Sequence, residues 1–541
     1  MIPLLLISII AFSSQSSMES KDSTRFPSEY RSFSGMNNNR FHRAWGAAGI
    51  YFQRISPAEY ADGKSAPGGS SRQSPRAITS TLMKQGDTTV PIDYNQSSFL
   101  WAWGQFIEHD MVLTLPAISE ETFNINIPQG DPLFDPERKG NQVIPFTRSE
   151  YVNHFNGKRQ QINRATSFID GSMIYGSDSL RANALRLNDG TGRLRTSNEN
   201  LLPFNTFGFE NSGGLGPELF LAGDPRVNEN TVLTALHTLF VREHNFWCNI
   251  IQSVRPGMSD YHIYQQARAL VIAEIQAITY NEFLPALLGP NPLPAYSGYK
   301  PEVNPTLSNE FATAALLAFH SMINKQICRL NSNLEIIPQG NLLLRNSFFS
   351  ISALTDEGNI DPVLRGLAYQ KAERIDIFIV DDLRDYLSGS TAHYRMDLAA
   401  INIQRGRDNG LASFNQFRKS IDLDPVTNLN TISSDPLCRS RLAQAYSSID
   451  DMDLWPVLLA EDHIVGSSVG LTLYKVLKRQ FQNLRDADRF WYQSYLPPNL
   501  KKIVEKRNLS RIIITNTGIG ANEIPANVFF ADSLAYENVE N

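Results

Sequence analysis

The sequence predicts a mainly α-helical protein that forms one large domain with little β structure. In residues 99–114, 220–251 and 310–324, apolar side chains recur at the spacing of one face of a helix. A chain of 541 residues can bury one large core or two or three ordinary ones. The sequence shows no internal repeat, low-complexity tail or clear linker, which favours a single domain. A hydrophobic content of 42% with 19% charged residues is typical of a folded globular protein.

The charge balance and the first residues bear on partners and location. A formal net charge of −6 argues against nucleic acid as the main partner. Residues 2–12 form an apolar run that is too short to span a bilayer, and small residues follow at 13–17. This order is typical of a secretory signal peptide, so we predict one over residues 1–17 and a secreted protein with no stable membrane insertion.

The cysteines limit covalent cross-linking and exclude several kinds of site. The chain has only three cysteines, Cys248, Cys328 and Cys438. Either two of them form one internal disulfide and leave one free thiol, or all three are buried thiols. No Cys-x-x-Cys pair occurs, which excludes zinc ribbons, thioredoxin-like sites and c-type haem attachment.

The predicted helix at residues 99–114, FLWAWGQFIEHDMVLT, carries an unusual set of polar residues. Gln105, Glu108 and His109 stand at i, i+3 and i+4 and so share one face, whereas Asp110 is rotated by about 100° from His109. Polar groups on an otherwise apolar face are costly unless they have partners. The sequence therefore leaves two interpretations, a structural core histidine or a functional site.

The segment ATSFIDGSMIYGSD, residues 165–178, is a candidate cation site. Thr166, Asp170 and Ser172 alternate with other residues, so an extended backbone would place their oxygen atoms on one side. Oxygen ligands suit a hard cation such as Ca²⁺. The alternative is ordinary turn chemistry, for which Asp-Gly-Ser is common.

Three further helices are predicted around candidate polar residues. Asp224 or Asn228 could cap the helix within residues 220–251, with Arg226 and Glu229 near its start. A helix over residues 260–284 should end at Pro285, and another should cover residues 375–386.

His320 lies in an almost wholly apolar segment, residues 310–324. It is either a core histidine that uses both ring nitrogens or a haem axial ligand. Further along the chain, Asn402 and Arg405 belong to a dense group of polar residues within LAAINIQRGRDNGLASFNQFR.

Taken together, these motifs resemble the animal (mammalian-type) haem peroxidase family, of the peroxinectin and myeloperoxidase kind. The resemblance is nearly full length and follows the family order. It is carried by YRSFSGMNNNR (30–40), PAEYADG (57–63), WGQFIEHD (103–110), TSFIDGSMIYG (166–176), FLAGDPRVNE (220–229), HTLFVREHN (237–245), DPVLRGL (361–367), INIQRGRDNG (401–410), DRFWYQ (488–493) and RIIITNTGI (511–519). It implies that residues 18–541 form a helical domain that reduces hydrogen peroxide to water and oxidises small donors such as halide, thiocyanate or phenols including tyrosine.

The resemblance also implies roles for the polar residues around the haem. His109 would be the distal histidine, Arg226 the distal arginine, and Gln105 part of the donor pocket. A neutral imidazole can move the proton of peroxide, and a guanidinium can stabilise the charge on the departing oxygen. His320 would be the proximal iron ligand, with Asn402 bonded to its other nitrogen, which fixes the tautomer and tunes the iron.

Further residues would hold the cofactors that the resemblance implies, haem b and Ca²⁺. Arg405 would pair with a haem propionate, and Glu108 and Glu229 match the carboxylates that esterify the haem in this family. Calcium would bind Asp110, Thr166, Asp170, Ser172 and the backbone carbonyl of Phe168.

Several positions depart from the family pattern. Glu108 stands where an aspartate is usual, Asn230 stands where a sulfonium-forming methionine can stand, and the usual cysteines are missing. A related fatty-acid oxygenase is one alternative, but Leu317 occupies the place of the radical-forming tyrosine of cyclooxygenases, three residues before His320. A non-catalytic secreted adhesion protein on the same scaffold is the other alternative.

Overall fold

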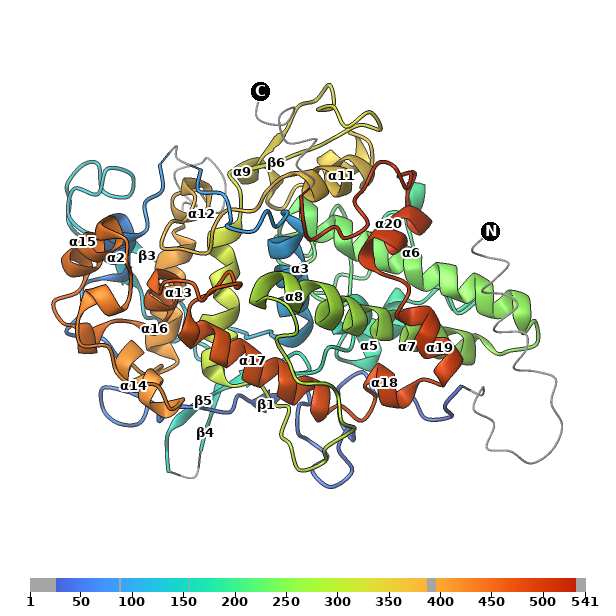
Figure 1. Ribbon diagram of the computed structural model, residues 1–541, viewed down its shortest axis with the longest axis horizontal. Coiled ribbons are helices and arrows are strands. Elements are labelled where there is room, and N and C mark those ends of the chain that lie inside the picture. The colour runs from blue at the N-terminus through green and yellow to red at the C-terminus, as the bar shows by residue number, and fades with distance from the viewer. Residues whose placement is uncertain (1–25, 87–88, 155, 387–395, 532–541) are drawn as a thin grey trace.

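A computed structural model describes residues 26–86, 89–154, 156–386 and 396–531, and helices dominate these residues (Figure 1). This confirms the prediction of a mainly α protein with little β structure. The predicted signal peptide, residues 1–17, lies outside the described residues.

The strands form small antiparallel sheets at the edge of the helical body. Their bounds are β1 Ile50–Tyr51, β2 Ile125–Asn126, β3 Val143–Ile144, β4 Tyr151–Asn153, β5 Arg159–Asn163, β6 Gln326–Ile327 and β7 Leu342–Leu343. One sheet has the order β1-β5-β4, and the pairs β2-β3 and β6-β7 form two-stranded sheets. The β5 strand leads directly into the segment of the predicted cation site.

The helices pack around a continuous apolar core. The α-helices are α2 Pro75–Leu82, α3 Phe99–Met111, α4 Ser172–Tyr175, α5 Ser179–Leu185, α6 Thr231–Val254, α7 Asp260–Ile278, α8 Leu284–Leu288, α9 Leu344–Ser347, α10 Ser352–Thr355, α11 Asp361–Tyr369, α12 Asp381–Arg384, α13 Leu398–Asp408, α14 Phe414–Ser420, α15 Pro436–Ala445, α16 Leu454–Ala460, α17 Leu471–Asp486, α18 Tyr492–Tyr495, α19 Pro498–Val504 and α20 Leu509–Asn516. The 3₁₀ segments are η2 Asn198–Asn200, η5 Leu316–Met322, η7 Leu429–Thr431 and η8 Ile449–Asp451. The π-helical segments are η3 Thr279–Phe283 and η4 Phe311–Ala315.

Helix α3 lies at the centre of the molecule (Figure 1), and most of its residues are buried. Trp103 and Phe106 pack against Phe240 of α6, with ring centroids 5.7 and 5.4 Å away. On another side, α3 meets η5 so closely that a Cβ at Gly104 would lie 2.6 Å from the Phe319 ring. Glycine is therefore required here, because any side chain would push the two helices apart.

Two predicted helix boundaries are wrong. Neither Asp224 nor Asn228 caps α6, because Asp224 binds Arg226 and Asn228 binds the backbone of Phe220. The cap is Asn230, whose side chain accepts from Leu233 N at 2.9 Å. Pro285 does not end the helical run, since the π segment η3 follows α7 and Pro285 then stands in the first turn of α8, where a proline is tolerated.

Three predicted segments differ in backbone form. Residues 310–324 are helical, but as the π turn η4 followed by the 3₁₀ helix η5. The predicted helix 375–386 is reduced to the short α12. The predicted extended backbone at residues 166–172 is wrong, because the chain bends through 167–170 before α4 begins at Ser172.

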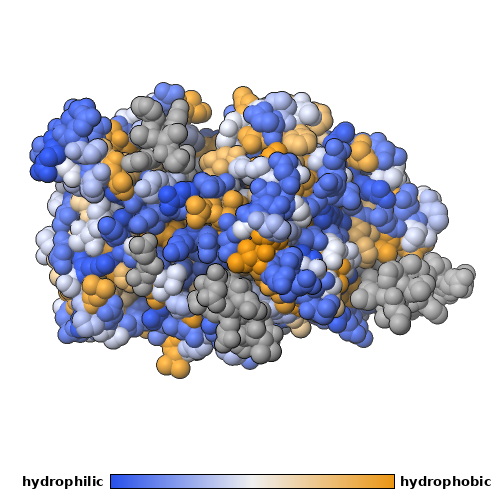
Figure 2. Space-filling view, turned by 90° about the horizontal axis from the view of Figure 1, so that it is seen from above, coloured by the Kyte–Doolittle hydropathy of each residue, from blue (hydrophilic) through white to orange (hydrophobic). Residues whose placement is uncertain are grey.

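The surface and the cysteines complete the description. Cys248, Cys328 and Cys438 are all buried free thiols, so the described chain contains no disulfide. Figure 2 shows a face on which hydrophilic residues predominate and hydrophobic ones form small groups. Within the described ranges, we find no helix with the length and apolar character needed to cross a bilayer.

Candidate active site

His109 projects from α3 into a group of carboxylates, and only 3% of its surface is exposed. Its Nε2 lies 3.3 Å from Glu108 Oε2 and 3.7 Å from Glu229 Oε2. Its Nδ1 is buried with no hydrogen-bond partner among the residues the structure describes. Burial first, and then the charge of Arg226, hold the pKa of His109 well below its usual value, so the imidazole is neutral near pH 7.

Arg226 is fixed beside His109 by the short segment that precedes α6. Its Nε and Nη2 donate to the two oxygens of Asp224 at 2.9 and 2.8 Å, and Nη2 also donates to Val112 O at 2.5 Å. Its Nη1 lies 3.5 Å from both carboxylate oxygens of Glu108. Burial alone would lower the pKa of Arg226, but Asp224 and Glu108 raise it above its usual value, so the guanidinium stays charged.

Asp224 is the functional residue of this group that sequence reasoning missed. The sequence predicts it as a helix cap, whereas the structure shows it bound to the Arg226 guanidinium. Burial would raise its pKa, but Arg226 and other donors lower it to about 2, so it remains an anion. The spacing Asp-Pro-Arg was the available signal, because a carboxylate two residues from an arginine can reach it in a tight turn.

Gln105 and the two glutamates complete this side of the site. Gln105 Nε2 donates to Glu229 Oε1 at 3.2 Å and its Oε1 accepts from Asn230 Nδ2 at 3.0 Å. Burial raises the pKa of both Glu108 and Glu229 to about 7, which Arg226 partly offsets. The two side chains are partly buried, with exposed fractions of 15% for Glu108 and 29% for Glu229, and their carboxyl groups with raised pKa values lie beside the neutral imidazole.

His320 stands on η5, the helix that α3 meets at Gly104. Its Nδ1 lies 2.9 Å from Nδ2 of Asn402 on α13, and its Nε2 has no hydrogen-bond partner within the described part of the chain. Burial lowers the pKa of His320 to about 4, so the ring is neutral. Asn402 Nδ2 can only donate, so in this arrangement Nδ1 accepts and the ring proton lies on Nε2. Nε2 becomes the donor that a haem iron requires when the Asn402 amide is turned over and its Oδ1 accepts from the Nδ1–H group.

Arg405 lies one helical turn beyond Asn402 on α13. Its Nη1 donates to Ser149 Oγ at 2.7 Å and Thr147 O at 3.2 Å, and its guanidinium stacks over the Phe146 ring at 4.1 Å. Its Nη1 also lies 3.4 Å from Asp408 Oδ2, so the bonds found for Arg405 in the described residues use Nη1. Its Nη2 group can bind a further carboxylate such as a propionate.

The predicted calcium residues come together on the far side of α3. Asp110 Oδ2 accepts from the backbone N–H groups of Asp170 and Gly171 at 3.0 and 3.1 Å, and Ser172 Oγ donates to the Asp110 carbonyl at 2.6 Å. Thr166 Oγ1 lies 3.5 Å from Phe168 O. Both carboxylate oxygens of Asp170 are buried without a hydrogen-bond partner in the described chain. Unpaired buried oxygens of this kind fit a hard cation.

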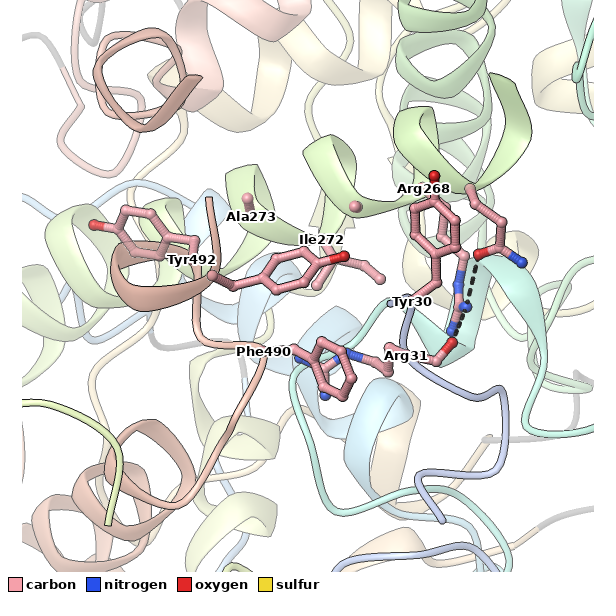
Figure 3. A pocket seen from close by; sticks show the side chains of 10 residues that line it. Tyr30, Arg31, Arg268, Ile272, Ala273, Phe490 and Tyr492 are labelled. Carbon is pink, nitrogen blue, oxygen red and sulfur yellow. Dashed lines mark hydrogen bonds between the residues drawn. The ribbon is translucent and has the colours of Figure 1, made fainter. Parts of the chain in front are cut away.

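The charges around Asp170 agree with that fit. Burial raises the pKa of Asp170 to about 6 and that of Asp110 to about 8, which marks a place where negative charge lacks compensation. Arg31 and Arg268 offset it in part, and Figure 3 shows how Arg268 donates to the Arg31 carbonyl, 2.7 Å away. Among the described residues, no group of three His, Cys, Asp or Glu side chains could hold a metal, so a cation at this place would also need hydroxyl and carbonyl oxygens.

Comparison with known proteins identifies the family. The animal haem peroxidase family model matches residues 30–529. The human probable oxidoreductase PXDNL is 36% identical over 93% of this chain, and the mouse peroxidasin homolog is 35% identical over 91%. The chain spans 38% and 37% of the length of these two relatives. Peroxinectin A of Dictyostelium discoideum is 34% identical over 86% of this chain and 89% of its own.

Solved structures agree with this comparison. Peroxidase A from Dictyostelium discoideum superposes with a TM-score of 0.86 at 32% identity, covering 93% of this chain and all of that one. The fatty acid alpha-dioxygenase of Arabidopsis thaliana has a TM-score of 0.78 at 18% identity, covers 98% of this chain and 88% of that one, and shares the fold alone. The chain described here belongs to the animal haem peroxidase family, whose cofactor is haem.

Proposed function

We propose that this chain is a haem-dependent peroxidase that reduces hydrogen peroxide to water and oxidises small donors. The observation that carries the proposal is the neutral His109 held beside the charged Arg226, on a helix that packs against the segment of the unpaired His320. When bound, haem would supply the redox chemistry, taking up the oxidising equivalents of peroxide and returning them to the donor.

Different side chains of the site would transfer the proton and stabilise the charge. His109 takes the proton from the peroxide oxygen that binds and delivers it to the oxygen that leaves as water. Arg226 stabilises the negative charge that develops on the leaving oxygen, and Asp224 keeps the guanidinium in place. Asn402 orients the His320 ring and fixes its tautomer.

Haem b would be held by His320 and Arg405, with ester links through Glu229 and Glu108. Each link would join a carboxylate oxygen to a haem methyl carbon. That carbon would lose one proton and two electrons, and peroxide would be the oxidant that takes up the electrons and leaves as water. Because Glu108 is one methylene longer than the usual aspartate, its link would follow a different path from the helix. Ca²⁺ would bind Asp110, Thr166, Phe168, Asp170 and Ser172.

The donor would be a halide, thiocyanate or a phenol such as tyrosine, bound near Gln105. We also propose an extracellular protein, on the strength of the apolar run at residues 2–12 followed by small residues. A fatty-acid oxygenase is less well supported, because Leu317 cannot form the radical that a tyrosine there would supply. An adhesion protein without activity would have no need of a buried His109 beside a charged Arg226.

A spectrum combined with steady-state rates tests the proposal. Purified protein supplemented with haem should show a Soret band and oxidise iodide and guaiacol when peroxide is added. Rates measured with chloride, bromide, iodide, thiocyanate and tyrosine would then rank the donors. Absence of a Soret band would contradict both the peroxidase and the oxygenase, whereas a Soret band without any turnover would favour the adhesion protein.

A further inference from the structure

A second cavity, with about 370 Å³ of space, lies outside the residues of the candidate active site. It is bounded by η3, the loop at residues 291–296 and the start of α18. Its lining residues include Tyr280, Asn281, Tyr296, Arg485, Trp491 and Gln493. Ligand pockets for small molecules occupy about 300–1,000 Å³, so this space can take a small aromatic group. We call it the aromatic groove.

The walls of the aromatic groove combine aromatic faces with polar groups. The ring centroids of Tyr296 and Trp491 lie 6.0 Å apart, and the Trp491 indole N–H donates to Gln493 Oε1 at 3.2 Å. Arg485 donates to Pro294 O at 2.7 Å and lies over the Tyr296 ring at 5.7 Å, which fixes the opposite wall. Stacking faces beside amide groups suit a phenolic ring, which has an apolar face and a polar hydroxyl.

A row of readily oxidised side chains leads inward from the aromatic groove. Trp491 and Tyr280 lie edge to face with their centroids 4.7 Å apart. Tyr280 follows Thr279, whose Oγ1 accepts from the Trp103 indole N–H at 3.1 Å. Trp103 stands on α3, two residues before Gln105 and next to Gly104, where α3 touches Phe319 beside His320. The row therefore ends where the two helices of the candidate active site meet.

The chemistry of these rings suits the movement of single electrons. Tryptophan and tyrosine lose one electron more easily than other side chains, and electron transfer through protein is fast only over short steps. The Tyr280 hydroxyl donates to the Phe481 carbonyl at 2.6 Å, and a carbonyl is too weak a base to take its proton. An oxidised Tyr280 would therefore keep its proton and remain a strong oxidant. It would quickly take an electron from Trp491, and the longer-lived radical would form on Trp491.

We propose that the aromatic groove binds the phenolic group of a donor too large for the haem cavity, and that electrons leave it through Trp491, Tyr280 and Trp103. The proposal rests on the proposed peroxidase function, which supplies the oxidant. One peroxide gains two electrons and two protons and gives two waters. Two phenolic groups each lose one electron and one proton, and the two phenoxyl radicals join through a new carbon–carbon or carbon–oxygen bond.

The first experiment locates the radical without measuring turnover. Haem-loaded protein is mixed with peroxide and a nitroso spin trap but no donor, and trapped peptides are identified by mass spectrometry. We expect the adduct on Trp491, and at least a tenfold loss of this adduct in Tyr280→Phe, which keeps the ring but is hard to oxidise. Trp45→Phe is the control, because Trp45 stacks on His42 at 3.8 Å outside the row.

The second experiment compares the oxidation of a free phenol with that of the same phenol attached to a large polymer. N-acetyltyrosinamide is used either free or coupled to dextran, with iodide as the reference donor. In Tyr280→Phe, oxidation of the dextran-linked phenol should fall at least tenfold, and iodide oxidation should stay within twofold of wild type. Trp491→Phe should act in the same way, and Trp45→Phe should change neither rate.

The outcomes are distinct. Normal iodide oxidation with no adduct on Trp491, or with an adduct that Tyr280→Phe leaves intact, would overturn the relay. Equal loss of iodide and dextran-phenol oxidation in a correctly folded Tyr280→Phe would also overturn it. Absence of iodide oxidation in the wild-type protein would instead refute the proposed peroxidase function and remove the basis of the relay.

Discussion

Beside α3, His109 is surrounded by Arg226 and three carboxylates, whereas His320 on η5 has Asn402 as its polar partner. The backbone differs as well, since α3 is a regular α-helix and the His320 segment changes from π to 3₁₀ geometry. His109 is buried and His320 is partly buried, and both rings are neutral because their pKa values are lowered. One face of the site is therefore built from charges and the other from apolar packing around one hydrogen bond.

The difference indicates what each face contributes. In the proposed peroxidase, the charged groups near His109 would control where protons and negative charge reside while peroxide is cleaved. An apolar setting around His320 excludes competing hydrogen bonds, so the ring direction is set by Asn402 and by packing. Substitutions on the two faces should therefore fail in different ways.

Removing the proximal imidazole should have the largest effect. In His320→Ala the iron loses its axial ligand, so we expect a lost or strongly shifted Soret band and no measurable iodide oxidation. Absorption and electron paramagnetic resonance spectra of the haem-supplemented variant check this. His463→Gln is the matched control, because that histidine bonds Asp93 at 2.9 Å, away from the site. A normal Soret band in His320→Ala would refute the axial assignment.

Removing the distal imidazole should leave haem binding intact and slow the chemistry. In His109→Gln the side chain keeps a polar group but cannot move protons, so the peroxide reaction should slow by about 10²–10⁴-fold. Stopped-flow mixing with peroxide, followed at the Soret band, measures this rate.

Arg226→Lys supplies the companion test on the same face. Lysine keeps the charge but loses the two-point contact with Asp224, so we expect a smaller loss, about 10²-fold or less. If His109→Gln lost its haem in the way expected of His320→Ala, the division between the two faces would be wrong.

The sequence predicts the charged face better than the apolar one. On α3 the polar positions follow from helical spacing alone, and Gln105, Glu108 and His109 do face one site. Local spacing cannot show that Asp224 turns back to Arg226 rather than capping α6, because that choice depends on long-range contacts to Val112 and Glu108. Side-chain type therefore identifies the candidate residues, and tertiary contacts assign their partners.

Backbone form on the apolar face was not predictable. Residues 310–324 have a helical composition, but η4 and η5 adopt π and 3₁₀ turns where the segment packs against α3 and α17. Similarly, Thr166, Asp170 and Ser172 come together through a bent chain rather than through strand alternation. In both places tertiary packing overrides the local pattern, although the residues expected at the site are those found there.

Calcium removal should destabilise the structure around His109 more than the structure around His320. Asp110 is the neighbour of His109 on α3, so loss of a cation would loosen the helix that carries the distal residues. Chelation should lower the unfolding free energy by about 2.7 kcal/mol if free calcium had stood at 100 times its Kd. Thermal unfolding and peroxide rates, with and without chelator, measure the two effects.

Two variants control for chelation. Asp170→Asn should reproduce the loss of stability and no longer respond to the chelator, while Asp189→Asn, in an exposed turn, should behave as wild type. If the chelator altered the haem absorption spectrum at concentrations that left the rate of the peroxide reaction unchanged, the assignment of calcium to the side of His109 would be contradicted.

Asn402 offers the smallest and most selective change. In Asn402→Leu the His320 Nδ1 loses its partner at 2.9 Å, and the ring can take either tautomer. We expect the midpoint potential of the haem to shift and iodide oxidation to fall by about 10–100-fold, as is usual when the partner of a metal-bound histidine is removed. In Asn402→Asp a carboxylate oxygen takes the place of the amide and accepts from the Nδ1–H group, so the potential should shift in the negative direction because the carboxylate makes the imidazole more electron-rich. Equal potentials in wild type and both variants would show that packing around η5, and not Asn402, orients His320.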